Sequence, residues 1–269
     1  MTPALLTPVL LLGAGHMGGA LIAGWRRSGA LDAADLIVRD PAPGPTALKA
    51  IRAGAAGNST DADLASARTV ILAVKPQTWR AAGEAIAPHL APDAVIISIM
   101  AGVTSRDLEE VFRPRPIVRV MPTTAAAVLK GAASLWSSDA RGRDAARRLF
   151  EPLGTVVDLN EEALMHVATA ASGSAPAYVY ALVEALEAAA LEAGLDAPAA
   201  RALSRSALTG AAALMEQSGA EAGELRRQVT SPGGTTEAAL KVLIGDGALD
   251  RLMSEAVRAA AARSRELGA

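Results

Sequence analysis

Three glycines near the N-terminus have the spacing G-x-G-x-x-G, in the segment Gly13-Ala14-Gly15-His16-Met17-Gly18. The segment follows an apolar run, Val9–Leu12, that is typical of a strand buried on both faces, and it opens a helical pattern. In that context Gly13 permits a tight turn, Gly15 lets the backbone approach a pyrophosphate, and Gly18 allows close helix–strand packing. The helix N-terminus then offers N–H groups to the phosphates. A purely structural turn is the alternative, but the strand–turn–helix order favours dinucleotide binding.

Two charged residues, Arg39 and Asp40, end the second predicted strand, where such folds contact the adenosine ribose. An acidic residue there accepts hydrogen bonds from a free 2′-hydroxyl and repels a 2′-phosphate, whereas an arginine does the opposite. Because side chains alternate along a strand, we expect only one of the two to face the ribose. We favour Asp40 as the residue that faces the ribose, and therefore expect the site to tolerate NADH.

A second candidate cofactor segment is Ala73-Val74-Lys75-Pro76, at the end of another predicted strand. A strand that leaves the sheet at its carboxyl end can lay its backbone against the nicotinamide ribose. The plainer alternative is a solvated lysine before a proline that starts a helix.

Two further segments carry small or hydroxyl-bearing residues. Residues 230–236, T-S-P-G-G-T-T, combine two glycines with four hydroxyls before a helix, so they can surround an anion with N–H and hydroxyl donors. On spacing alone, an ordinary N-cap at Thr235 or Thr236 is the favoured interpretation. Residues 172–178, S-G-S-A-P-A-Y, interrupt an apolar helical run, either as a proline kink or to leave space for a substrate.

Residues 1–158 alternate short β-rich runs with helical stretches, which predicts an α/β Rossmann domain with a doubly wound, mostly parallel sheet. The predicted strands are 9–12, 36–38, 70–74, 95–99, 117–120, 132–136 and 156–159. The predicted helices between them are 17–27, 46–53, 77–87, 106–112 and 141–150.

Residues 159–269 show only helical patterns, which predicts an all-α dimerisation domain. Asn160 is the predicted N-cap of a helix from about 161 to 171. The next helix, 176–192, has only a thin charged stripe, so we expect it to be buried on most sides. The remaining predicted helices are 198–217, 221–228, 236–244 and 249–267. A helical half this apolar predicts a homodimer, with a compact monomeric bundle as the alternative.

The composition excludes several classes of protein. The net charge of −2 comes from intermixed acids and bases, so nucleic-acid binding is disfavoured. The chain has no cysteine, which fits a cytoplasmic location, and its three histidines do not have the spacing of a metal site. Five glycines interrupt the apolar N-terminal run, and no basic residue precedes it, so we expect neither a targeting signal nor a membrane segment.

Taken in order, the motifs resemble those of pyrroline-5-carboxylate reductases over nearly the whole chain. They are G-A-G-x-M-G at 13–18, A-V-K-P at 73–76, A-G-V-T at 101–104, M-P-x-T at 121–124, S-G-S-x-P-A-Y at 172–178 and T-S-P-G-G-T-T at 230–236. The resemblance implies reduction of 1-pyrroline-5-carboxylate to L-proline with NADPH or NADH, the last step of proline biosynthesis. It also implies interlocked dimers, which can assemble further.

The resemblance also assigns roles to individual residues. The implied cofactor contacts are Gly13, Ala14, Gly15, His16, Met17, Gly18, Arg39, Asp40, Thr60, Ala73, Val74, Lys75, Pro76 and Ala101. The implied substrate contacts are Ser172, Ser231, Gly233, Gly234 and Thr235. Thr236 is the implied catalytic residue, which hydrogen-bonds the ring nitrogen, and in the family the loop that carries it comes from the partner subunit.

The chain departs from the family pattern at four positions. Thr123 stands in place of an asparagine, Ala125 in place of a proline, and Ala175 in place of a glycine. His166 stands near a position where the family commonly has an acidic residue. These departures bear on substrate preference and efficiency more than on the class of reaction.

The reaction implied is hydride transfer from the nicotinamide to an imine carbon. A cyclic imine is basic enough to be protonated in water, so the protein mainly positions the reactants. One alternative is a β-hydroxyacid or ketopantoate-type dehydrogenase, which employs a lysine in the helical half, where Lys241 is the sole lysine. A non-catalytic NAD(P)-binding interaction protein is the other.

Overall fold

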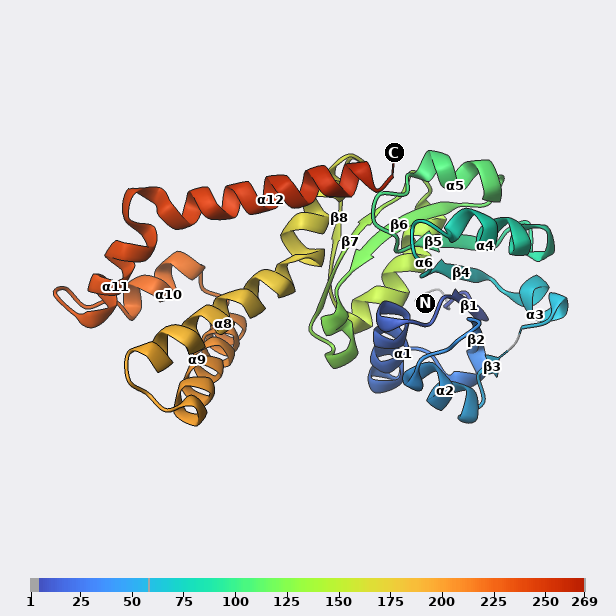
Figure 1. Cartoon of the computed structure of the whole chain (residues 1–269). Helices are drawn as coiled ribbons and strands as arrows, with labels where there is room; N and C mark the ends of the chain where they lie inside the picture. The colour runs from blue at the N-terminus through green and yellow to red at the C-terminus, as the bar shows by residue number, and fades with distance from the viewer. Residues whose placement is uncertain (1–4, 58, 269) are drawn as a thin grey trace. The chain divides into compact units, whose positions relative to one another are not determined.

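The first part of the chain is built on an eight-stranded sheet with the order β3-β2-β1-β4-β5-β6-β7-β8 (Figure 1). The computed structural model describes residues 5–57 and 59–268. The strands are β1 Val9–Leu12, β2 Leu36–Arg39, β3 Ala56–Gly57, β4 Thr69–Leu72, β5 Val95–Ser98, β6 Ile117–Pro122, β7 Gly131–Trp136 and β8 Gly154–Asp158. The predicted Rossmann-type sheet followed by a helical region is confirmed.

The pairing of the strands brings several turns to one edge of the sheet. The described pairs are parallel except β6 with β7, which is antiparallel. Leu12 lies beside Leu72, and Leu72 lies beside Ser98. Because β1, β4 and β5 run in the same direction, the turns that follow them meet at the carboxyl edge, where open α/β sheets bind their ligands.

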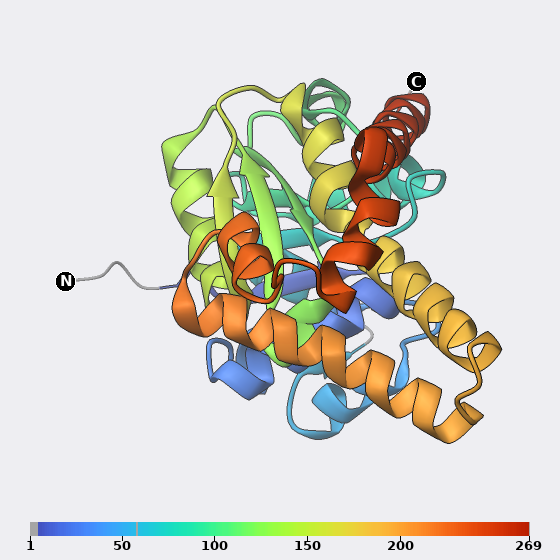
Figure 2. The same cartoon turned by 90° about the vertical axis from the view of Figure 1, so that its left-hand side faces the viewer.

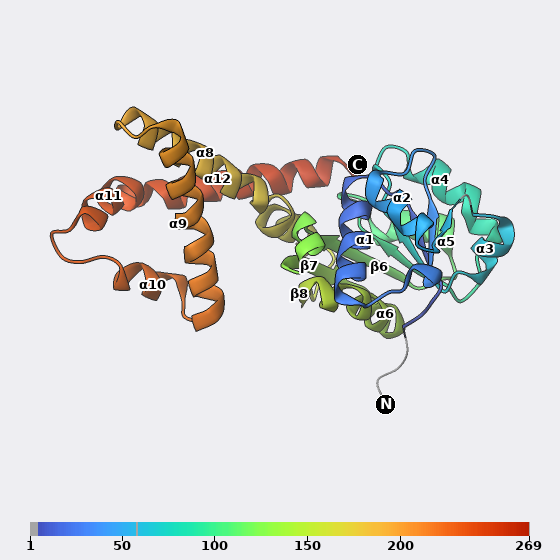
Figure 3. The ribbon, with the colours of Figure 1, turned by 90° about the horizontal axis from the view of Figure 1, so that it is seen from below.

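Apolar cores on both faces of the sheet explain the unbroken apolar strands. The helices of the first core are α1 His16–Ser28, α2 Pro45–Arg52 and α6 Ala140–Phe150, and those of the second are α3 Asp61–Ser66, α4 Trp79–Ile86 and α5 Ser105–Phe112. Leu11 of β1 packs in the first core and Leu10 in the second. Helix α1 also packs along η3, Thr124–Val128 (Figure 3).

The later elements are helical. They are α7 Leu164–Ala168, the π-helical turn η5 Thr169–Gly173, α8 Ala175–Glu192, α9 Ala197–Ser218, α10 Ala222–Gln228, α11 Thr235–Ile244 and α12 Ala248–Glu266. Helices α8 and α9 meet at the turn around Gly194 and diverge from it (Figure 2). None of the described helices has the length and apolar character needed to span a bilayer.

By compactness the chain divides into two units. The first comprises the chain up to Ser174 together with its end from Arg258, and the second comprises Ala175–Val257. The first unit therefore includes α7, η5 and the last turns of α12, which lie beyond the predicted domain boundary at 158/159.

The start of the helical half differs from the prediction at Asn160. Helix α7 begins at Leu164 with Ala163 as its N-cap, so the predicted helix start at 161 is wrong. The carbonyl oxygens of Glu161 and Glu162 accept hydrogen bonds from the N–H groups of Leu164 and Met165, at 3.2 and 2.9 Å. These three-residue spans form a turn before the helix, and they leave the Asn160 side chain outside it.

Candidate active site

The glycine-rich turn between β1 and α1 has the shape that its spacing predicts. Gly13 has φ 95°, and a Cβ there would lie 2.7 Å from the carbonyl carbon and oxygen of Ala73, so only glycine fits. A Cβ on Gly18 would lie 2.5 Å from the Gly13 carbonyl oxygen. The predicted roles of these two glycines, a tight turn and close helix packing, are confirmed.

Gly15 differs from its two neighbours because its surroundings are open. It is the N-cap of α1 with φ −72°, and a Cβ there would meet no atom within 4 Å. A pocket of about 450 Å³ opens beside it, lined by residues that include His16, Thr46 and Thr124. The N-terminus of α1 therefore has room for a phosphate group next to its free N–H groups.

Arg39 and Asp40 face different partners, as the alternation along β2 predicts. The Asp40 carboxylate accepts hydrogen bonds from the N–H groups of Ala14 and Ala42, at 2.6 and 2.7 Å. Arg39 donates from Nη1 to the backbone oxygen and Oγ of Ser59, at 3.3 and 3.2 Å. Asp40 therefore ties the end of β2 to the glycine-rich turn, whereas Arg39 points toward the loop after β3.

Thr60, implied as a further contact near the ribose, has a structural role in this structure. Its Oγ1 accepts from the N–H of Asp63 at 3.2 Å, and its own N–H donates to the Asp63 carboxylate at 2.7 Å. This reciprocal pair is a capping box that starts α3. Thr60 thus holds the loop that contains Ser59, the partner of Arg39.

The turns after β4 and β5 complete the carboxyl edge. The Ala73 N–H donates to the Leu12 carbonyl at 2.8 Å, and the Ile99 N–H donates to the Leu72 carbonyl at 3.1 Å. Lys75 is exposed at this edge. The structure therefore brings segments 13–18 and 73–76 and residue Ala101, all predicted to contact the cofactor, to one side of the sheet.

The S-G-S segment forms a π-helical turn between α7 and α8 rather than the predicted proline kink alone. Ser172 donates from Oγ to the Ala168 carbonyl at 2.8 Å. A Cβ on Gly173 would lie 3.3 Å from Cγ of Met121, at the end of β6. The small residues therefore allow a close approach to the M-P-T segment, and π-helical turns of this kind are frequent at functional sites.

Thr123, a departure from the family pattern, has a local hydrogen bond that accounts for its side chain. It is 5% exposed, and its Oγ1 accepts from the Ala132 N–H at 3.0 Å. The hydroxyl thereby joins the ends of the antiparallel β6–β7 pair.

The hydroxyl-bearing turn lies in the second unit and leads into α11. Gly234 is the N-cap of α11 and makes no side-chain capping bond, so the N-cap predicted at Thr235 or Thr236 is wrong. The Gly233 N–H, in a residue with φ 71°, donates to the Glu237 carboxylate at 2.6 Å. Thr235 is exposed and Thr236 half-buried in the first turn of this helix, next to backbone N–H groups that can bind a carboxylate.

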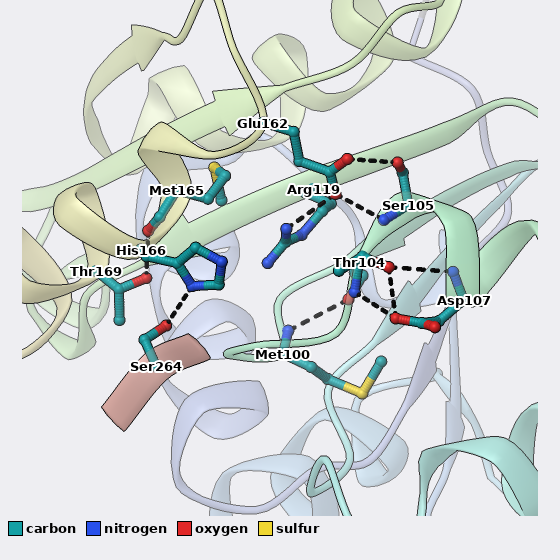
Figure 4. Close-up of polar contacts among 11 residues, drawn as sticks. Met100, Thr104, Ser105, Asp107, Arg119, Glu162, Met165, His166, Thr169 and Ser264 are labelled. Carbon is teal, nitrogen blue, oxygen red and sulfur yellow. Dashed lines mark hydrogen bonds and ion pairs between the residues drawn. The ribbon is translucent and has the colours of Figure 1, made fainter. Parts of the chain in front are cut away.

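A partly buried charge cluster in the first unit lies outside the sites predicted from the sequence (Figure 4). The Glu162 carboxylate accepts from the N–H and Oγ of Ser105, both at 2.6 Å, and from Nη1 of Arg119 at 2.9 Å. The Arg119 side chain is 3% exposed, and its Nε has no hydrogen-bond partner among the residues that the structure describes. Arg119 was the visible signal, because it is the one charged residue within the apolar strand β6.

Glu162 of this cluster and the nearby His166 on α7 have shifted pKa values. Burial raises the pKa of Glu162, but hydrogen bonds from Ser105 and the charge of Arg119 outweigh that effect and leave the pKa below its ordinary value of 4.5. The pKa of His166 is lowered from 6.5, first by burial and then by the charges of Arg119 and Arg265. The cluster therefore favours an ionised glutamate and a neutral histidine.

Comparisons with known proteins agree with this architecture. Residues 162–267 match the family model described as pyrroline-5-carboxylate reductase dimerisation, and residues 8–102 match that of coenzyme F420-dependent NADP oxidoreductases. A pyrroline-5-carboxylate reductase of Pseudomonas aeruginosa is 37% identical over 96% of both chains. The chain belongs to the pyrroline-5-carboxylate reductase family.

Solved structures of this family have the same fold as the chain. A pyrroline-5-carboxylate reductase from Coxiella burnetii is 30% identical, with a TM-score of 0.88 over 98% of this chain and 99% of that one. The enzyme from Plasmodium falciparum, with NADP bound, is 26% identical, with a TM-score of 0.85 over 99% and 100% of the two chains. The family resemblance drawn from the motifs is confirmed.

Proposed function

We propose that this protein is a pyrroline-5-carboxylate reductase, which reduces 1-pyrroline-5-carboxylate to L-proline with NADPH or NADH. The observation that carries the proposal is the P. aeruginosa relative, 37% identical over 96% of the chain. The carboxyl edge of the sheet supports it independently, because three turns meet there beside an open helix N-terminus.

The residues at the edge fit a dinucleotide. Close backbone contact at Gly13 and open space at Gly15 give the pyrophosphate a shelf of backbone N–H groups at the start of α1. The segments 73–76 and 101–102 would hold the nicotinamide ribose by backbone contacts. When bound, the reduced dinucleotide supplies the hydride that the imine carbon accepts.

The turn 231–236 is our proposed substrate site. Ser231 and the backbone of Gly233, Gly234 and Thr235 would hold the substrate carboxylate at the N-terminus of α11. Thr236 would donate a hydrogen bond at the ring nitrogen, which becomes a secondary amine as the hydride arrives. Ser172 would line the substrate space. These groups bind and orient the imine, and the ring nitrogen takes its proton from water, either before the hydride arrives or as it arrives.

We propose a homodimer in which each turn 231–236 serves the cofactor edge of the other copy. The family match over residues 162–267 supports dimerisation. So does the apolar surface of the second unit, where Leu182 is 59% exposed, Leu203 60% and Val242 78%. Exposed apolar surface of this extent in a helical unit is typical of an interface between subunits. We also propose a cytoplasmic location, because the chain has no cysteine.

The contacts of Arg39 and Asp40 lead us to replace the expectation drawn from Asp40, which favoured NADH, with the proposal that NADPH is used in preference to NADH. Both Asp40 oxygens accept backbone N–H groups, whereas Arg39 and the Ser59 hydroxyl stand together and can donate to a 2′-phosphate. We expect Arg39→Ala to lower kcat/KM for NADPH about tenfold or more and to change that for NADH by less than about threefold. Equal losses with both cofactors would contradict this assignment.

The function is tested by following NADPH absorbance with 1-pyrroline-5-carboxylate while L-proline is quantified. We expect one proline for each NADPH consumed, and proline-dependent reduction of the oxidised cofactor in reverse. Reduction of ketopantoate with NADPH, or oxidation of a β-hydroxyacid with the oxidised cofactor, without turnover of the imine would support the alternative dehydrogenase. Cofactor binding without turnover of any of these substrates would support a non-catalytic binding protein.

A further inference from the structure

The C-terminal end of the chain packs directly on the turn that follows β5. Gly102, in that turn, has φ 85°, and a Cβ there would lie 2.7 Å from the backbone nitrogen of Gly268 and 2.9 Å from the Ser264 carbonyl oxygen. In return, a Cβ on Gly268 would overlap the Gly102 carbonyl oxygen. The two backbones are therefore in direct contact, and a glycine is required on both sides.

A partly buried hydrogen bond between Ser264 and His166 also holds this contact. The Ser264 hydroxyl lies 3.0 Å from Nδ1 of His166 on α7 (Figure 4), and Ser264 is 4% exposed. Burial along α12 is confined to this end, because Ala261 and Ser264 are its buried residues. Glu162, one turn before His166, is itself held by Ser105 and Arg119. The end of α12 thus lies on an ordered part of the first unit.

The turn that it contacts belongs to the carboxyl edge of the sheet. The Ile99 N–H donates to the Leu72 carbonyl at 3.1 Å, so the chain after β5 runs beside the chain after β4. Met100 is 3% exposed and packs in the core below the edge. The chain then turns at Ala101 and Gly102, where Gly102 has φ 85°. Their position depends on what packs behind them, and Leu267 and Gly268 pack there.

We propose that residues 264–268 are a positioning element of the dinucleotide site: by packing on Gly102 they hold Ala101 where it contacts the bound cofactor. The inference rests on the proposed function, since it assigns Ala101 to the cofactor site. These residues act through the turn and do not touch the cofactor. Their removal therefore weakens cofactor binding and leaves the substrate turn 231–236 unaffected.

Three variants test the proposal at increasing severity. Ser264→Ala removes the hydrogen bond to His166, and Gly268→Ala forces residue 268 away from Gly102. Deletion of residues 267–269 removes the contacts of Leu267 and Gly268 with Gly102 while leaving α12 and Ser264 in place. Gly210→Ala is the matched control, because a Cβ there meets no atom within 4 Å. The readouts are Kd for NADPH by fluorescence titration, KM for 1-pyrroline-5-carboxylate, and Tm.

We expect Kd for NADPH to rise roughly threefold to tenfold in Gly268→Ala and in the deletion variant, and less in Ser264→Ala, with KM for the imine within about twofold of wild type. A lower Tm with unchanged Kd would show a merely structural role and overturn the proposal, as would a Kd within about twofold of wild type in the deletion variant. If the wild type binds NADPH but does not reduce the imine, the proposed function fails while this binding test still stands.

Discussion

The two compact units differ sharply in how much of their apolar surface they bury. Every residue of β1, β4 and β5 in the first unit is buried, and helices cover both faces of the sheet. In the second unit, α8, α10 and α11 bury no residue, and α9 buries only two small ones, Ala200 and Ser204.

This difference separates two kinds of functional element. The carboxyl edge is complete within one chain, because its glycines pack against backbone atoms of the same chain. We therefore expect one chain to supply the whole dinucleotide site. The helical unit leaves apolar side chains such as Leu182 and Leu203 exposed. These side chains stabilise the protein only when another surface covers them. We therefore expect variants of the first unit to change cofactor affinity, and variants of the second to change association or substrate turnover.

The largest effect is expected at Thr236. Thr236→Ala should lower kcat/KM for 1-pyrroline-5-carboxylate by about one to three decades, as the loss of one transition-state hydrogen bond does, with Kd for NADPH unchanged. Thr209→Ala is the control, because among the described residues the Thr209 hydroxyl donates to the carbonyls of Arg205 and Ser206 in its own helix, α9. If Thr236→Ala also raised Kd for NADPH by a similar factor, the cofactor edge and the substrate turn would not act separately, which would contradict the proposal.

A carboxylate at Gly15 should prevent cofactor binding without unfolding the protein. The open space at this position accommodates a side chain, but a negative charge there opposes the pyrophosphate, so Gly15→Glu should raise Kd for NADPH about a hundredfold. Ala34→Glu adds the same charge at an exposed position before β2, away from the carboxyl edge, and should bind normally. Unchanged NADPH affinity in Gly15→Glu would remove the α1 N-terminus from the site.

A charge among the exposed apolar side chains of the second unit should dissociate the dimer. Leu182→Glu places a carboxylate on α8, and we expect the dissociation constant, measured by sedimentation equilibrium, to rise more than about thirtyfold. Leu48→Glu is the matched control, since Leu48 is an exposed leucine (40%) on α2 in the first unit. A wild-type chain that sediments as a monomer would contradict the dimer directly.

A smaller effect is expected in the charge cluster of the first unit. Because the pKa of Glu162 is below 4.5 in the folded protein, its ionised form stabilises the fold above that pH, and this stabilisation is lost as the pH falls through the folded pKa. Glu162→Gln should lower the free energy of unfolding at pH 7 by about 1 to 2 kcal/mol, allowing for partial exposure. It should also make the free energy of unfolding less dependent on pH in the acid range. Urea titrations of both proteins at several pH values measure both effects, and identical pH profiles would contradict the assignment.

Much of the architecture could be predicted from the sequence, because it depends on local patterns. The run Val9–Leu12 and the glycines that follow it specify a buried strand, a tight turn and a helix within about 20 residues of chain. The hydroxyl-bearing turn and its helix were found in the same way, although the N-cap is Gly234 rather than Thr235 or Thr236.

The remainder depends on contacts between distant parts of the chain. Arg119 and Glu162 are 43 residues apart, and His166 and Ser264 are 98 apart, so neither pair shows in a local pattern. The wrong prediction of an N-cap at Asn160 also comes from distant contacts. The side chain of Glu162 binds Ser105 and Arg119, and the helix begins only after it, at Leu164. Likewise, the order Arg39-Asp40 does not show that the Ala14 N–H donates a hydrogen bond to the Asp40 carboxylate.

The most direct test of the central claim is to coexpress two impaired variants, Gly15→Glu and Thr236→Ala. The claim is that a working site joins the cofactor edge of one copy to the turn 231–236 of another. Random pairing then gives mixed dimers in which one of the two sites is intact, so activity should return to roughly a quarter of the wild-type value. A coexpressed mixture no more active than either variant alone would contradict the account.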